Sequence, residues 1–156
     1  MEDLRVPTVA LSAEVLCADG RRFRGSIFVP AAALTHAGPT RPEDWMNESM
    51  SFFPFLPDGG GGPVLLNKRE ILVVTVAAEA DAEDIPEEAA GPQRRVAVEA
   101  ESERLEGTIV VNMPENQARV LDYLNRPQPF VTLRDENLHH LIQKERITRV
   151  VEIREG

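Results

Sequence analysis

The sequence predicts an all-β protein with short helical insertions, made of two similar five-stranded units. Three observations lead to this prediction. Short apolar segments with partial alternation recur along the chain, turn-forming residues separate them, and blocks of the first half reappear in the same order in the second half. We therefore expect two small bent sheets or barrels, at residues 12–80 and 93–155, joined by a linker at residues 81–92.

The clearest repeated block reads Arg-x-x-Asp-aromatic-apolar-Asn and occurs at Arg41–Asn47 and at Arg119–Asn125. Three further pairs of blocks keep the same order, namely Arg22–Val29 with Arg104–Val111, Phe53–Leu56 with Phe130–Leu133, and Leu66–Ile71 with Ile142–Ile147. The spacing between partners drifts by only a few residues, as loops of different length would produce. We interpret this pattern as an internal duplication.

Each unit is expected to contain five short strands and one helical insertion after the second strand. The predicted strands are 13–17, 23–29, 53–56, 64–67 and 71–76, then 96–100, 104–111, 130–133, 138–142 and 147–153. The repeated Arg-x-x-Asp block should form one or two helical turns. Gly25 and Gly107 hold matching positions in the second strands, where glycine suits a bulge or a sharp bend that curls a small sheet.

This strand pattern resembles the small, strongly bent barrels of Sm-like and SH3-like proteins. The Gly-x-apolar-x-apolar strands at Gly25 and Gly107 resemble the first Sm signature, whereas the Arg-Gly pair of the second signature is absent. The repeat is also similar to sequences from bacterial families of unknown function. The resemblance covers both units and implies a fold but no activity.

We expect the two units to pack closely, either as a pseudo-two-fold pair or with their sheets merged into one assembly. Units of this size bury little surface on their own, and open barrels leave strand edges that need covering. The last predicted strand, 147–153, is rich in β-branched residues, which suits a homodimer through this edge.

The repeated block supplies the candidate binding residues, which are Arg41, Asp44, Trp45, Arg119, Asp122 and Tyr123. In each copy the arginine and the aspartate are three residues apart and can share one face of a helical turn. The closing asparagine is expected to end that turn in a left-handed conformation. A structural role in folding explains every position of the block. The alternative interpretation is a groove for a ligand or a partner, lined by the arginine and the aromatic ring.

No motif predicts catalysis, a cofactor or a metal. Gly59–Gly62 lacks the Lys-Ser/Thr of a phosphate loop and reads as a hairpin loop. The neighbours His139 and His140 should point to opposite faces of a strand, and Cys17 should be a small buried side chain. His36 lies in a longer loop of the first unit. We therefore expect a protein that is not an enzyme.

Charge and composition narrow the choice of partner. The net charge is −9, and the linker 81–92 holds five acidic residues and no basic one, so the two units are close to neutral. Neither unit has the basic excess of a nucleic-acid binder. The chain has one cysteine and no apolar run long enough to span a membrane, which favours the cytoplasm.

The sequence thus predicts a non-catalytic binding or assembly module whose partner is another protein or a second copy. Two alternatives stay open. Sm-like barrels often bind RNA, although the charge makes nucleic acid an unlikely partner here, and a small molecule could bind between the two units.

Overall fold

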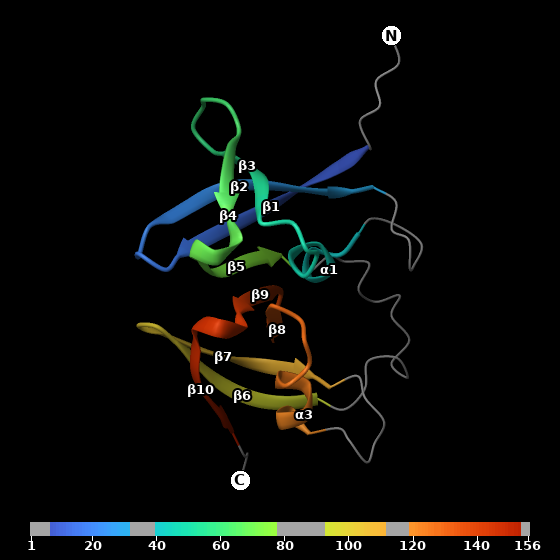
Figure 1. The fold of residues 1–156 in the computed structure, drawn as a ribbon, viewed down its shortest axis with the longest axis vertical. Helices are drawn as coiled ribbons and strands as arrows, with labels where there is room; N and C mark the ends of the chain where they lie inside the picture. The colour runs from blue at the N-terminus through green and yellow to red at the C-terminus, as the bar shows by residue number, and fades with distance from the viewer. Residues whose placement is uncertain (1–6, 32–39, 78–92, 112–118, 154–156) are drawn as a thin grey trace.

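The computed structural model describes residues 7–31, 40–77, 93–111 and 119–153. The protein is mostly β, and the ten strands in these ranges form a single antiparallel sheet (Figure 1). The predicted all-β class with short helical insertions is therefore confirmed. The linker 81–92 and His36 lie outside the described residues.

The strands fall into two sets of five, which we call the first half and the second half. The strands of the first half are β1 (Thr8–Cys17), β2 (Arg22–Pro30), β3 (Phe52–Pro57), β4 (Val64–Asn67) and β5 (Ile71–Ala77). Those of the second half are β6 (Gln93–Ala100), β7 (Glu103–Val110), β8 (Phe130–Asp135), β9 (Leu138–Gln143) and β10 (Ile147–Glu152). The helices are α1 (Pro42–Met46) and α3 (Val120–Leu124), with 3-10 turns η1 (Lys68–Glu70) and η4 (Lys144–Arg146). These elements confirm the predicted strands and helical turns.

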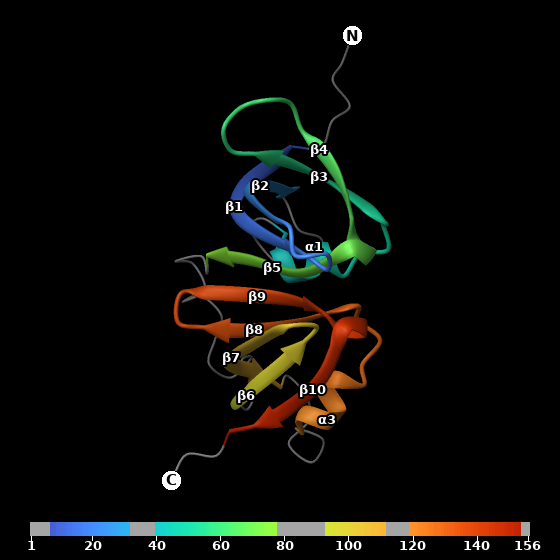
Figure 2. The ribbon, with the colours of Figure 1, turned by 90° about the vertical axis from the view of Figure 1, so that its left-hand side faces the viewer.

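The strand order runs β5-β1-β2-β3-β4 in the first half and β10-β6-β7-β8-β9 in the second half. Strands β5 and β9 pair with each other, so the two halves share one continuous sheet (Figure 2). We call β5 and β9 the central pair. Because β5 is the fifth strand of its half and β9 is the fourth, the central pair joins unlike strands. The predicted pseudo-two-fold packing is not confirmed, and the sheets are merged.

Pairing within each half follows the same register. β1 pairs with β5 through a bulge in which Leu72 is the extra residue, and β6 pairs with β10 through a bulge in which Thr148 is the extra residue. Residues that occupy the same place in the register of the two halves are called counterparts below. Leu72 and Thr148 are thus counterparts, and the two ladders bend at the same point.

The register corrects the alignment of the third strands by one residue. Phe52 lies opposite Asn67, and Phe130 lies opposite Gln143, so Phe52 rather than Phe53 is the counterpart of Phe130. Matching the two phenylalanines by identity was misleading, because Phe53 faces the core of its own half and Phe130 contacts the core of the other half.

Gly25 and Gly107 are required by a close approach of two strands. The β1–β2 register runs without interruption through Gly25, so a bulge is not present there. A Cβ at Gly25 would overlap with the backbone carbonyl oxygen of Leu56, and one at Gly107 would lie 2.5 Å from that of Arg134. Glycine therefore lets β3 and β8 pass close to β2 and β7 at the two positions where a bulge or a sharp bend is predicted.

Two hydrophobic clusters form the core, and the central pair contributes to both. The first cluster lies inside the first half and includes Phe130 and Leu141 from the second half. The second cluster lies inside the second half and includes Leu16, Leu72 and Val73 from the first half. Because each half contributes side chains to the core of the other, the halves are packed as one hydrophobic body.

Candidate interaction surfaces

The repeated Arg-x-x-Asp block occupies α1 in the first half and α3 in the second half. Arg119 and Asp122 form an ion pair at 2.8 Å between Nε and Oδ2, which lowers the pKa of the Asp122 carboxyl. Arg41 and Asp44 do not form the matching pair within the described residues. Since the arginine of the intact pair is well exposed, we attribute little folding energy to it.

The aromatic residues of this block pack into the hydrophobic clusters. Trp45 lies against the first cluster and Tyr123 against the second cluster. The Thr132 N–H in β8 donates to the Tyr123 hydroxyl at 3.1 Å. Its counterpart Pro54 has no N–H, and Trp45 has no acceptor to offer, so this hydrogen bond is absent from the first half. The indole N–H of Trp45 is buried there without a hydrogen-bond partner among the described residues.

The structure gives these six predicted residues different surroundings. Helix α1 lies beside the central pair and contacts β8, whereas α3 lies further down in the second half (Figure 1). A groove lined by the arginine and its aromatic neighbour stays a prediction.

The closing asparagine of α1 holds the two halves together. Asn47 has φ −89° and Asn125 has φ −88°, so the predicted left-handed conformation is wrong for both. The Asn47 side chain instead accepts a hydrogen bond from the Phe130 N–H in β8 at 2.8 Å. No periodicity signals this contact, because the two residues are far apart in the chain.

A second polar contact fixes the end of the central pair. The buried side-chain amide of Gln143 donates to the backbone carbonyls of Lys68 and Ile71, at 2.9 and 2.6 Å. These carbonyls lie at the 3-10 turn that precedes β5, where the backbone leaves the ladder. The central pair is thus fixed at this end by hydrogen bonds as well as by apolar packing.

The histidines lie in β9 at the other end of the central pair. His140 Nδ1 lies 2.8 Å from the Thr75 hydroxyl, and its Nε2 lies 3.8 Å from an Asp135 oxygen. Burial lowers the pKa of His140 and of His139. Among the described residues, no group of three possible ligands could hold a metal ion.

Most exposed apolar side chains lie on the two edge strands of the sheet or on a strand next to one of them. Seven large hydrophobic residues of the described chain are exposed, and they are Phe52, Leu56, Val64, Leu65, Leu121, Leu138 and Val151. Four of them lie on β3 and β4, and we call Phe52, Leu56, Val64 and Leu65 the β4 edge cluster. Val151 lies on β10, the opposite edge strand, and Leu121 lies on α3. The sequence signalled the β4 edge cluster only by the apolar runs at residues 52–57 and 64–66.

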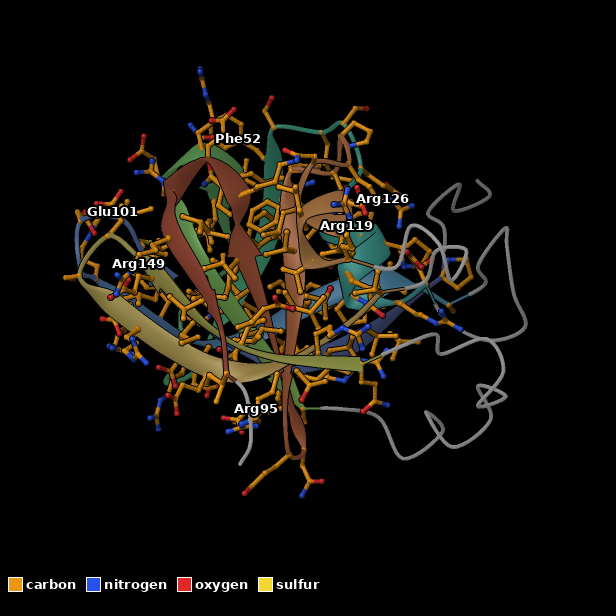
Figure 3. The ribbon with its side chains drawn as sticks, turned by 90° about the horizontal axis from the view of Figure 1, so that it is seen from below. Phe52, Arg95, Glu101, Arg119, Arg126 and Arg149 are labelled. Atoms are coloured by element: carbon orange, nitrogen blue, oxygen red, sulfur yellow. The ribbon has the colours of Figure 1, made fainter. Side chains whose placement is uncertain are left out.

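The β10 edge also carries charge. Glu99 on β6 forms an ion pair with Arg149 on β10, and this pair lowers the pKa of the Glu99 carboxyl. Seen from below, Arg149 lies on the same side as Glu101, away from Arg119 and Arg126 at α3 (Figure 3). On β10 itself the charged Arg149 and the apolar Val151 are two residues apart and lie on the same face.

A shallow hollow of about 460 Å³ lies on the second half alone. Its lining residues are Arg95, Arg104, Leu105, Glu106 and Asp135. Charged side chains of both signs line this hollow, and it lacks the apolar, enclosed character of a small-molecule site.

Comparison of the chain with protein-family models, with curated proteins and with solved structures finds no match. Helices α1 and α3 have five residues each, and no helix in the described ranges has the length and apolar character needed to cross a membrane. The surfaces above are therefore interpreted from their own chemistry.

Proposed function

We propose that this protein is a non-catalytic assembly module that binds other protein chains through the free edges of its sheet. One observation carries the proposal: six of the seven exposed large hydrophobic residues lie on the edge strands β4 and β10, on the neighbouring β3, or on α3. Phe52, Leu56 and Leu65 lie on one face of β3 and β4, and Val64 lies on the other face. Exposed apolar side chains gathered on one face are typical of protein–protein contacts.

An edge strand adds main-chain hydrogen bonding to this apolar surface. The N–H and C=O groups along the outer side of β4 and β10 have no strand partner in the described sheet. An extended protein segment can satisfy such groups while its side chains cover the apolar cluster. Val64 and Leu65 bring no charge to β4, so this edge suits a protein better than a nucleic acid.

We also propose that the two halves are copies of one unit, at residues 12–80 and 93–155, of the Sm-like or SH3-like kind. The shared strand order, the bulges at Leu72 and Thr148 and the bend glycines Gly25 and Gly107 support this proposal. We place the module in the cytoplasm, since the chain has a single cysteine.

Photo-crosslinking in the cell tests the proposed function. A photoreactive amino acid at Leu65, which is 70% exposed, should give adducts with protein. The matched control is the same group at Arg24, which is also well exposed but lies on the inner strand β2. Adducts with RNA alone, or equal protein adducts at both positions, would contradict the proposal.

A further inference from the structure

We propose that the partner of the β4 edge is a second copy of this chain, bound head to tail, with β10 of one molecule paired to β4 of the next. This inference rests on the proposed function and names the partner of the same edge. It follows from the way the two halves are joined in one molecule.

The central pair shows how the fifth strand of one half binds the fourth strand of another. It consists of β5 and β9, and the two strands left free at the edges are β10, a fifth strand, and β4, a fourth strand. Each molecule therefore carries both members of a matching pair at opposite ends of its sheet. Such a heterologous contact repeats from copy to copy, and it gives a ring when the rotation between copies closes and an open chain when it does not.

Two exposed residues of the β4 edge cluster, Phe52 and Leu65, are counterparts of residues that are buried at the central pair. Phe130 and Leu141 are 2% and 0% exposed, and both pack against the core of the first half. Their counterparts Phe52 and Leu65 are 52% and 70% exposed. In the head-to-tail pair, these two side chains enter the second cluster of the next molecule beside α3.

The polar contacts of the central pair also have free counterparts. Asn47 accepts the Phe130 N–H, and the matching groups are the exposed Asn125 and the N–H of Phe52. Asn67 is the counterpart of Gln143. Its Oδ1 accepts a hydrogen bond from the Arg69 N–H at 3.0 Å, which leaves its amide N–H groups to donate to the turn before β10. The same two hydrogen bonds can therefore form between molecules.

One exchange replaces two side chains of opposite charge by two apolar side chains. Near the central pair, Arg134 lies close enough to Glu43 to act against the burial that raises the pKa of this carboxyl. The counterparts of these two residues are Leu56 and Leu121, both exposed. A leucine on each side suits direct apolar packing between copies.

The head-to-tail pair should be weaker than the central pair. In the register of the central pair, Val150 would lie opposite Leu65, and Arg149 opposite Leu66. Arg149 takes the place of a buried valine, and burying its charge beside an apolar strand is costly. We therefore expect reversible assembly that depends on concentration.

Two single-edge variants of the full chain test the direction of pairing. Leu65→Asp puts a charge on β4 and leaves β10 intact, whereas Val151→Asp changes β10 and leaves β4 intact. Both residues are exposed, so the fold should tolerate the changes. Leu138→Asp, at an exposed residue outside both edges, is the control, and circular dichroism checks the fold of each variant.

Sedimentation velocity should show concentration-dependent assembly of the wild type and of the control. Each edge variant alone should lose association by about 100-fold or more. Their equimolar mixture should form a dimer with one copy of each variant, because one intact β10 and one intact β4 remain. Retained dimerisation of either variant alone would indicate pairing of like edges and would overturn the head-to-tail arrangement.

Sedimentation and photo-crosslinking together distinguish a chain that does not self-assemble from a chain that binds no protein at the β4 edge. A wild-type chain that stays monomeric up to its solubility limit would overturn self-assembly. If photo-crosslinking at Leu65 still gives adducts with a different protein, the proposed function holds and only the identity of the partner is wrong. Adducts with a second copy, at β10, support both proposals.

Discussion

Strands β5 and β10 hold the same place in the two halves, yet one is buried on both faces and the other lies at the edge of the sheet. Each pairs with the first strand of its half through a bulge at the same position. In β5 the residues Ile71 to Val74 are all buried, whereas in β10 Thr148 and Arg149 are exposed. The two strands hold the same place in the strand register, and their side chains differ with what covers them.

Three amino-acid differences between counterparts account for most of the difference in burial between β5 and β10. Leu16, Leu72 and Val73 are buried in the second cluster, and their counterparts are Glu99, Thr148 and Arg149. A charged side chain on an edge strand limits uncontrolled pairing with other chains. The β10 edge is therefore protected on one face by charge and left apolar at Val151, which permits a selective contact rather than general aggregation.

Replacing Val73 of β5 by arginine, the residue that β10 has at the same place, should have the largest effect on stability. Val73→Arg buries an unpaired guanidinium between the two halves, since Val73 is 3% exposed. We expect a loss of about 4 kcal/mol in the free energy of unfolding, because a buried charge without a partner is strongly destabilising. Urea unfolding followed by circular dichroism measures this loss.

The reverse exchange is the matched control. Arg149→Val should change the free energy of unfolding by less than about 0.5 kcal/mol, because exposed ion pairs contribute little. It should strengthen self-association in sedimentation velocity. Equal losses of stability for the two variants would show that β5 and β10 do not differ as described.

Gly25 and Gly107, the bend glycines, hold matching positions at which the two halves have the same close approach of strands. Gly25→Ala places a methyl group against a backbone carbonyl that cannot move without disturbing β3. We expect a loss of about 3 kcal/mol, similar to overpacking in a core. Gly107→Ala should cost less, since its Cβ has slightly more room, and thermal unfolding of both variants tests this order.

Much of this architecture could be predicted from the sequence, and particular residues show where prediction ends. The unbroken apolar run Ile71–Val74 indicates a strand buried on both faces, and the polar residues of Ile147–Ile153 indicate an edge. Alternation fixes which side chains point inward, but it does not say which strand lies alongside. The central pair and the Asn47–Phe130 hydrogen bond therefore required the structure, and matching phenylalanines by identity shifted the third strands by one residue.

Substitutions of Asn47 and Asn125 should have different effects, the first on the stability of one molecule and the second on association between molecules. Asn47→Ala leaves the Phe130 N–H without an acceptor at the central pair, so we expect a loss of about 1.5 kcal/mol in chemical denaturation. Asn125→Ala should leave the stability of the monomer unchanged and weaken self-association. Destabilisation by both variants alike would contradict an intermolecular role for Asn125.

The histidines of β9 provide the smallest expected effect, a dependence of stability on pH. Burial lowers the pKa of His139 and His140 in the folded chain, so the unfolded chain binds protons more readily. Stability should be full above the ordinary histidine pKa of about 6.5 and should fall as the pH drops below it. The counterpart of His140 is Val64 on β4, so this position contributes no such dependence in the first half.

Replacing His140 by glutamine should reduce the change of the urea midpoint with pH between about pH 6.5 and 5. Exposed carboxylates titrate below this window. Glu99 and Asp122, whose pKa values are lowered by their arginine partners, lose their contribution only at more acidic pH. His139→Gln in the same window separates the two histidines. A wild-type midpoint that does not change across this window would show that neither histidine is kept neutral by burial, and it would weaken the description of β9 as an inner strand.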